Sequence, residues 1–412
     1  MVLGGHRLRD VRAASSQPYD IPATAPDEPA AIIFTTGSTG PPKGVLYTHG
    51  IFDAQLRILR EHLRIQPGEI DLPTFPLFAL FDPALGMTAV IPDMDPTRPA
   101  QVDPTKIIRA IRDQQVTNMF GSPALLDRVG RYGAAQGVKL PTLRRVVSAG
   151  APASPVVLKR FATMLEGDAE IHTPYGATEA MPVASIGSRE ILRETRAVSA
   201  RGGGTCVGRP MPGLDVRIIG IRDGPIETWS DGLLAPPGEI GEIVVRGPIV
   251  TREYPADAAA TRQAKIRDGD AVWHRMGDVG RLDEQGRLWF CGRKAHRVIT
   301  EHGTLCTVPC EAVFNQHPRV FRSALVGVGR PPRQKPVICT ELQPGDRCRR
   351  GPRPRAADLA GLTRELLALA KQHDLTRPIE TVLFHPGFPV DIRHNSKIFR
   401  EKLAVWAEKR LR

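Results

Sequence analysis

The stretch that most constrains this chain is a loop of small residues, 35–44, that directly follows the apolar run 31–34. The loop is rich in hydroxyl residues and glycines, and it closes with a single lysine. Backbone N–H groups of such a loop, hydroxyl side chains and one positive charge together favour an anion. The sequence therefore predicts a strand followed by a polyphosphate-binding loop. The candidate binding residues are Thr35, Thr36, Gly37, Ser38, Thr39, Gly40 and Lys43.

Two other interpretations of the loop fit less well. An ordinary surface turn would explain the Gly, Ser, Thr and Pro content. It would not explain contiguous hydroxyl residues, or a lysine held between Pro42 and Gly44. A Walker A loop requires Ser or Thr after its lysine to hold magnesium, whereas Lys43 is followed by Gly44. The P-loop NTPases are therefore excluded.

The bulk composition indicates a globular protein of two or more domains, because 412 residues exceed what one hydrophobic core usually supports. No apolar run is long enough to cross a bilayer, and the first residues lack a secretory signal, so we expect a cytoplasmic location. The net charge of +12 comes largely from dispersed arginines, and aromatic residues make up only 5%. This favours a soluble enzyme with anionic ligands over a nucleic-acid-binding protein. The six cysteines form no CxxC pair, and we expect free thiols.

Helix and strand patterns alternate in the middle of the chain, which predicts an α/β sheet. A helical pattern over 107–112 precedes an apolar run at 116–120. The next buried strand, expected from residue 143, ends in small residues. Glycine at the carboxyl end of a strand leaves room for a flat ring to approach the backbone. The residues of this turn are Gly150, Ala151 and Pro152.

A second motif, 172–179, reads His-Thr-Pro-Tyr-Gly-Ala-Thr-Glu. Tyr175 can stack on adenine, the Thr178 hydroxyl can reach a phosphate, and the Glu179 carboxylate can hold the magnesium that neutralises a transferring phosphate. Taken alone, the motif is also compatible with a turn before a helix. Its position after the loop favours a nucleotide site, with Gly176 as part of it.

These motifs, in this order, resemble those of the adenylate-forming superfamily: acyl-CoA synthetases, luciferases and peptide-synthetase adenylation domains. The segment 33–45 with Thr48 and His49 resembles the superfamily's ATP phosphate loop. The residues 175–179 resemble its Tyr-Gly-x-Thr-Glu motif. The resemblance implies ATP and Mg²⁺ as cofactors.

The resemblance also implies a role for single residues. The loop with its lysine would hold the β- and γ-phosphates, Thr178 the α-phosphate and Glu179 the magnesium. Asp278 matches the aspartate that accepts hydrogen bonds from both ribose hydroxyls, a task suited to a carboxylate. Arg293 resembles the arginine that binds ribose or phosphate. Lys397 matches the catalytic lysine that bridges the attacking carboxylate and the α-phosphate, where a flexible point charge follows the moving charge.

The Pro-bounded run 73–83 corresponds to the family region that shapes the acyl pocket. Many acyl-CoA synthetases carry a histidine where this chain has Ala79. The phenylalanines are equally compatible with core positions. The candidate pocket residues are Phe75, Phe78, Ala79 and Phe81.

We expect three parts: a flexible lead-in at 1–30, an AMP-binding domain at 31–291, and a small α/β lid at 292–412 that carries the lysine. Short β-rich runs with Gly/Pro turns over 201–250 predict a small β-barrel or sheet within the large domain. Superfamily members usually carry a much longer segment before the phosphate loop, so the large domain is expected to be incomplete at its N-terminus. Ala295 occupies the position that is often Asp or Lys at the lid hinge.

The versions of these motifs look most like those of olefin β-lactone synthetases of bacterial hydrocarbon synthesis. This resemblance implies ATP-dependent adenylation of a long-chain 2-alkyl-3-hydroxy acid, then intramolecular closure to a β-lactone with release of AMP and pyrophosphate. Other enzymes of the same pathway are expected partners. A fatty-acyl-CoA or acyl-AMP ligase is the alternative within the superfamily. An inactive fragment that binds ATP or a partner protein is the alternative of another class.

Overall fold

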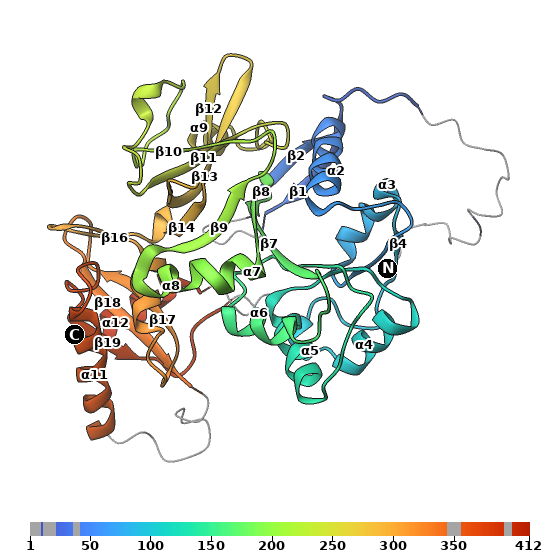
Figure 1. Ribbon diagram of the computed structural model, residues 1–412. Helices are drawn as coiled ribbons and strands as arrows, with labels where there is room; N and C mark the ends of the chain where they lie inside the picture. The colour runs from blue at the N-terminus through green and yellow to red at the C-terminus, as the bar shows by residue number, and fades with distance from the viewer. Residues whose placement is uncertain (1–9, 11–21, 36–41, 344–355, 391–397) are drawn as a thin grey trace.

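The computed structural model describes residues 10, 22–35, 42–343, 356–390 and 398–412. Figure 1 shows three regions along the chain: a blue-to-green region with a parallel sheet, a yellow-green antiparallel region, and an orange-to-red C-terminal region. A 12-stranded sheet joins the first two regions. The mixed α/β fold predicted from the sequence is confirmed.

The chain enters this fold through a hairpin. The antiparallel strands β1 (Pro29–Phe34) and β2 (Gly44–Thr48) form a separate two-stranded sheet, and α2 (His49–Leu63) follows at once. The Thr48 side chain caps α2 by accepting a hydrogen bond from the backbone N–H of Ile51. The predicted phosphate-binding loop is therefore the connection of a β-hairpin.

The first half of the large sheet is parallel, in the order β4, β3, β5, β6, β7. Helices cover both of its faces. Successive residues of a strand point to opposite faces of the sheet, so two neighbours in one strand pack against different helices. Val146 packs in one hydrophobic cluster with residues of α4, α5 and α6, whereas Val147 packs with residues of α2 and α3. The elements are β3 (Ile70–Pro73), η1 (Pro76–Leu80), α3 (Asp82–Leu85), β4 (Thr88–Ala89), η2 (Pro99–Gln101), α4 (Pro104–Asp113), β5 (Asn118–Phe120), α5 (Pro123–Ala135), β6 (Arg145–Val147), α6 (Pro155–Ala162) and β7 (Glu170–Ala177).

Three helices of this half start with the same local signal. A polar cap residue, namely Asp103, Ser122 or Ser154, accepts a hydrogen bond from a backbone N–H of the first turn, and a proline follows it. Proline has no N–H to lose at this position and its φ is already helical. The helices α4 and α5 and the strand β5 confirm the alternation that the sequence predicted.

The second half of the sheet is antiparallel and continues from β7 through β8, β9, β14, β13 and β11 to β10, with β12 on β13. The short strands expected at 201–250 are present, and their closure into a barrel stays a prediction. The elements are β8 (Ala180–Gly187), α7 (Ser188–Glu190), η3 (Ile191–Thr195), α8 (Arg196–Val198), η4 (Ser199–Gly203), β9 (Thr205–Pro210), β10 (Asp215–Ile219), η5 (Asp231–Leu233), β11 (Gly241–Arg246), α9 (Ala258–Ala264), β12 (Lys265–Asp268), β13 (Ala271–Leu282) and β14 (Leu288–Arg293).

The C-terminal region has its own three-stranded sheet, β17-β18-β19, with helices on both faces. Leu325 packs with residues of α10 and α11, whereas its neighbour Ala324 packs with residues of α12. The elements are η6 (Lys294–His296), β15 (Val298–Thr300), β16 (Gly303–Leu305), α10 (Thr307–Phe314), β17 (Val320–Val328), β18 (Lys335–Leu342), α11 (Ala356–Lys371), β19 (Thr381–Phe384) and α12 (Arg400–Leu411).

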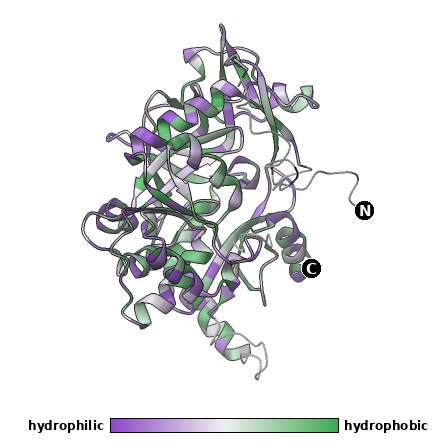
Figure 2. Ribbon diagram, turned by 90° about the vertical axis from the view of Figure 1, so that its right-hand side faces the viewer, coloured by the Kyte–Doolittle hydropathy of each residue, from purple (hydrophilic) through white to green (hydrophobic). Residues whose placement is uncertain are grey.

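In Figure 2 the helices carry hydrophobic and hydrophilic residues along the same helix, as expected where one face packs on a sheet. Among the described residues, no helix combines the length and hydropathy that a bilayer-spanning segment needs. The cysteines at 206, 291, 306, 310 and 339 are free thiols.

Candidate active site

The ends of the predicted phosphate-binding loop are fastened to each other. The Thr35 backbone N–H donates to the Lys43 carbonyl over 2.9 Å, and the Lys43 N–H donates to the Thr35 hydroxyl oxygen over 3.1 Å. The Lys43 ammonium lies 5.3 Å from the centre of the Tyr254 ring. The loop residues Thr36, Gly37, Ser38, Thr39 and Gly40 lie outside the described residues.

The second motif forms the end of β7 and the tight turn into β8. Gly176 is required there, because a Cβ at this position would lie 2.7 Å from the Ala180 carbonyl oxygen on the facing strand. Thr178 and Glu179 occupy the turn, so both side chains sit at the junction of the parallel and antiparallel halves. The alternative of a turn before a helix is wrong, since the motif is the start of a β-hairpin.

Three residues predicted for the nucleotide are brought together from three strands. The Tyr175 hydroxyl on β7 donates to Oδ2 of Asp278 on β13 over 2.6 Å. The Arg293 guanidinium at the end of β14 lies 2.9 Å from the other oxygen, Oδ1. The β13 and β14 ladder pairs Asp278 directly with Arg293. A carboxylate has about four acceptor positions, so Asp278 retains capacity for further hydroxyl donors.

The electrostatics of this group follow from its burial. Burial raises the pKa of Asp278, while the positive charge of Arg293 and the hydrogen bond from Tyr175 act to lower it. Burial also raises the pKa of the Tyr175 phenol. Glu179 is near enough for its charge to act on both Asp278 and Arg293. The charge of Glu179, in the 172–179 motif, therefore interacts with the charges of Asp278 and Arg293 on β13 and β14.

Glu179 itself is half-buried. Its Oε1 accepts a hydrogen bond from the Tyr254 hydroxyl over 2.6 Å. Among the residues that the structure describes, Oε2 accepts no hydrogen bond and forms no ion pair. An anionic oxygen donor with one atom held and the other available fits a divalent cation such as Mg²⁺.

The turn predicted for the adenine side follows β6. Gly150 is solvent-exposed and has a φ of 89°, a conformation that glycine adopts without strain, and Ala151 and Pro152 come next. The backbone of the preceding Ser148 donates to the His172 carbonyl, so this turn lies beside the strand that carries Tyr175.

The predicted acyl-pocket residues lie in and around η1. Phe78 packs on Phe120 at the end of β5, with ring centres 4.3 Å apart, and Phe75 contacts Phe78. Phe81 contacts Phe52 of α2 instead. Phe75 is 44% exposed, and Phe78, Ala79 and Phe81 are half-buried, so none of the four is a fully buried core residue.

The predicted catalytic lysine, Lys397, lies outside the described residues. Its flanks are described: Val390 and Ile398 pair as an isolated antiparallel bridge between β19 and α12.

Several residues at the site were not predicted from the sequence. The Tyr47 hydroxyl on β2 donates to the Thr178 carbonyl over 2.5 Å. Thr251 donates to the Glu179 carbonyl from both its N–H and its hydroxyl, each over 3.0 Å. Tyr254 follows three residues later. Nothing in the local pattern around these residues distinguishes them, because only tertiary contacts bring them to the motif.

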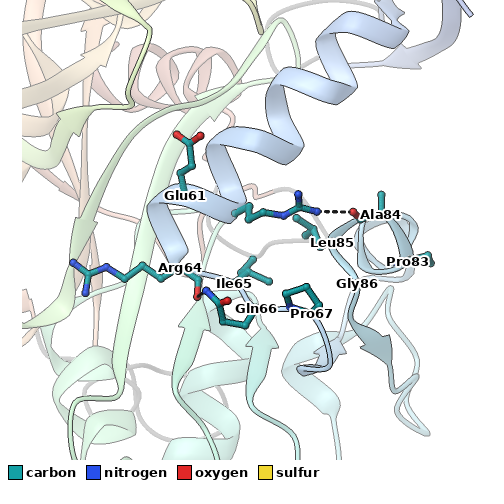
Figure 3. Close-up of a pocket in the computed structure, with 10 residues that line it drawn as sticks. Glu61, Arg64, Ile65, Gln66, Pro67, Pro83, Ala84, Leu85 and Gly86 are labelled. Carbon is teal, nitrogen blue, oxygen red and sulfur yellow. Dashed lines mark hydrogen bonds between the residues drawn. The ribbon is translucent and has the colours of Figure 1, made fainter.

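A surface cavity of about 610 Å³ lies elsewhere, between the end of α2 and α3 (Figure 3). The guanidinium of Arg60, one of the lining residues, donates a hydrogen bond to the Ala84 carbonyl over 2.8 Å. Its lining contains none of the predicted site residues. The lining residues are Arg60, Glu61, Arg64, Ile65, Gln66, Pro67, Pro83, Ala84, Leu85 and Gly86.

Known sequences similar to this chain are adenylate-forming enzymes of the kind that the motifs resemble. The profile of the AMP-binding enzyme family matches residues 5–255. The olefin beta-lactone synthetase of Xanthomonas campestris pv. campestris is 52% identical over 404 residues, which are 97% of this chain and 70% of the relative. That of Stenotrophomonas maltophilia is 50% identical, over 94% of this chain and 69% of the relative. The 2-succinylbenzoate–CoA ligase of Geobacillus kaustophilus is 31% identical, over 84% and 64%.

Solved structures share the fold. The amide bond synthetase from Marinactinospora thermotolerans superimposes with a TM-score of 0.71 at 26% identity, over 92% of this chain and 69% of that chain. The O-succinylbenzoate coenzyme A synthetase from Bacillus subtilis, solved with ATP and magnesium ion, gives a TM-score of 0.70 at 21% identity, over 96% and 74%.

Proposed function

Because the chain belongs to the AMP-binding enzyme family and is an AMP-forming ligase, we propose that it converts a long-chain 2-alkyl-3-hydroxy acid, with Mg-ATP, into a β-lactone, AMP and pyrophosphate. The observation that carries this proposal is the similarity to two olefin beta-lactone synthetases over nearly the whole chain. The similarity to the CoA ligase is much lower. We also propose that the protein has other enzymes of the same hydrocarbon pathway as partners.

In the first half-reaction the carboxylate of the acid attacks the α-phosphorus of ATP and pyrophosphate leaves, so that an acyl-adenylate forms. We assign the β- and γ-phosphates to the loop with Lys43, and the α-phosphate to Thr178 and Lys397. Asp278 and Arg293 bind the ribose side in this assignment. Adenine stacks on Tyr175 beside the turn at Gly150, Ala151 and Pro152. Preorganised donors of this kind act where charge develops in the transition state.

Magnesium fits the available Oε2 of Glu179, where, when bound, it neutralises phosphate charge.

In the second half-reaction the 3-hydroxyl of the same acid attacks the activated carbonyl carbon. A ring C–O bond forms between the hydroxyl oxygen and the carbonyl carbon, the bond from that carbon to the AMP oxygen breaks, and the hydroxyl proton passes to solvent water. Nucleophile and electrophile are in one molecule, which supplies a large proximity effect. The reaction needs no CoA thiol. The aromatic surface of Phe75, Phe78 and Phe81 with Ala79 is our assignment for the alkyl chains.

The test is AMP release from Mg-ATP and a synthetic 2-alkyl-3-hydroxy acid, with lipid products analysed in the presence and absence of CoA. We expect AMP and β-lactone without CoA. Replacement Lys397→Ala should lower the rate by roughly a hundredfold or more, because a charge on the reacting oxygens is lost. Lys402→Ala, five residues further on, is the matched control and should retain activity.

Two outcomes contradict the proposal. A thioester that forms only when CoA is present would identify an acyl-CoA ligase. Nucleotide binding without AMP from any acid, unaffected by Lys397→Ala, would identify a non-catalytic ATP-binding fragment.

A further inference from the structure

A cluster of side chains behind Glu179 has no role in the mechanism given above. Tyr254 follows β11 in the chain and is 6% exposed. Its hydroxyl is 2.6 Å from Oε1 of Glu179. Its ring lies 5.3 Å from the Lys43 ammonium and 6.0 Å from the Lys265 ammonium. One tyrosine thus contacts both the carboxylate assigned to magnesium and the lysine assigned to the phosphates.

The same segment also holds the backbone of Glu179. Thr251 donates two hydrogen bonds to the Glu179 carbonyl. The carbonyl and the hydroxyl oxygen of Thr251 in turn accept hydrogen bonds from the buried Lys265 ammonium on β12. Both the main chain and the side chain of Glu179 are therefore fixed by residues 251–254.

Lys265 is a buried partner of this segment. It is 7% exposed, and burial of its cation lowers its pKa to about 7, while the negative charge of Glu179 opposes that shift. Its ladder partner His274 is also buried, and burial with the nearby Lys265 charge lowers the pKa of that imidazole, so it stays neutral and adds no second positive charge beside Lys265. A buried cation requires fixed acceptors, and Thr251 provides them.

We infer that Tyr254 is a positioning residue for the metal: its hydroxyl holds one oxygen of Glu179 so that the other faces the phosphates, and its ring keeps Lys43 on the same side. This inference rests on the proposed function of Glu179 and extends it to a residue that does not touch the reacting atoms. Partners that orient a ligating carboxylate typically change metal affinity by ten- to a hundredfold when removed.

The test uses the full chain with Mn²⁺ as the metal and α,β-methylene-ATP as a nucleotide that cannot release pyrophosphate. Metal binding is measured by electron paramagnetic resonance, and nucleotide binding without metal by calorimetry. Tyr254→Phe removes only the hydroxyl. It should weaken Mn²⁺ binding about tenfold or more and leave metal-free nucleotide binding within about twofold. Tyr132→Phe, a partly exposed tyrosine on α5, should change neither.

A double-mutant cycle separates positioning from a general loss of structure. In a Glu179→Gln background, Tyr254→Phe should cause no further loss of Mn²⁺ affinity, because the held carboxylate is already absent. A loss of the same size in both backgrounds would overturn the inference. So would unchanged Mn²⁺ affinity in a folded Tyr254→Phe variant, as judged by its melting temperature.

Mn²⁺ binding by the unmodified protein tests the assignment of Glu179, and the effect of Tyr254→Phe tests the role of Tyr254. If the unmodified protein binds no Mn²⁺ with the nucleotide analogue, the assignment of Glu179 to the metal is wrong. If it binds Mn²⁺ and Tyr254→Phe does not alter the affinity, only the role of Tyr254 is wrong.

Discussion

Two buried carboxyl groups each contribute to the pH dependence of the protein's stability. Asp71 on β3 is 7% exposed and Asp82 at the start of α3 is 2% exposed. Burial, with a smaller contribution from the charge of Asp82, raises the pKa of Asp71 to about 7. Burial raises the pKa of Asp82 to about 6. Between 3.8 and about 7 these two carboxyl groups therefore bind more protons in the folded state than in the unfolded state, so their contribution to the free energy of unfolding falls as pH rises through this range.

Replacement Asp71→Asn should flatten this dependence, because the amide carries no charge to bury. For Asp71 alone, the difference between 3.8 and about 7 corresponds to roughly 4 kcal/mol. We expect the variant to be more stable than the unmodified protein at pH 8 and to gain nothing at pH 4. Urea unfolding across this pH range measures it. Asp168→Asn, at a fully exposed carboxylate, is the control, and equal pH slopes for all three proteins would contradict the account.

The site residues that could be predicted from the sequence are those that lie in a distinctive local sequence motif. Tyr175, Asp278 and Arg293 were named from motifs, and the structure brings them within hydrogen-bonding or ion-pair distance of one another. Tyr254 was not predicted, although it contacts Glu179 directly, because its partner is 75 residues away and its own segment has no special pattern.

The close approach of β8 and β9 requires a glycine at position 208. Gly208 on β9 has a φ of 89°, and a Cβ there would lie 1.8 Å from the Ser185 carbonyl oxygen on β8. We expect Gly208→Ala to lower the free energy of unfolding by about 3 kcal/mol or more, since both strain and a backbone clash are introduced. Urea unfolding measures the change.

Gly224→Ala is the matched control, because a Cβ at Gly224 meets no atom within 4 Å. A loss of equal size in the two variants would show that the β8 and β9 approach is not the cause. The sequence predicted short strands with Gly/Pro turns over 201–250. In the structure Gly208 lies within strand β9 and not in a turn. The continuity of these strands with the parallel sheet depends on pairing between distant segments, which local patterns do not encode.

The connection between the large region and the C-terminal region is fastened to the large region. The Lys294 ammonium lies 2.9 Å from Oε1 of Glu242, a side chain with no exposed surface. The Arg297 guanidinium lies 2.7 Å from Asp223. Ala295, the residue at the predicted hinge, lies between these two anchors in η6. Under the proposed function, ring closure within one substrate would not require a second lid orientation that admits CoA.

We expect the double replacement Lys294→Met and Arg297→Met to free this connection. Amide hydrogen exchange over residues 294–300 should become about tenfold faster or more, equivalent to about 1.4 kcal/mol, because one pair involves a buried carboxylate. Exchange is measured by mass spectrometry, and Arg131→Met, which removes an exposed ion pair with Asp127 on α5, is the control. Exchange that is already fast in the unmodified protein, and equal in the variant, would mean that the two ion pairs do not restrain the connection.

We propose that the whole molecule activates the carboxyl group of a 3-hydroxy acid by adenylation and closes the same acid to a β-lactone. The most direct measurement supplies the acid with both carboxyl oxygens as ¹⁸O, together with Mg-ATP and no CoA, and analyses AMP and lipid by mass spectrometry. The account predicts one ¹⁸O in AMP and one in the lactone carbonyl, because the carboxylate oxygen that attacks phosphorus leaves with AMP. Lactone formation with AMP free of ¹⁸O, or labelled AMP with only the free acid as lipid product, would contradict it.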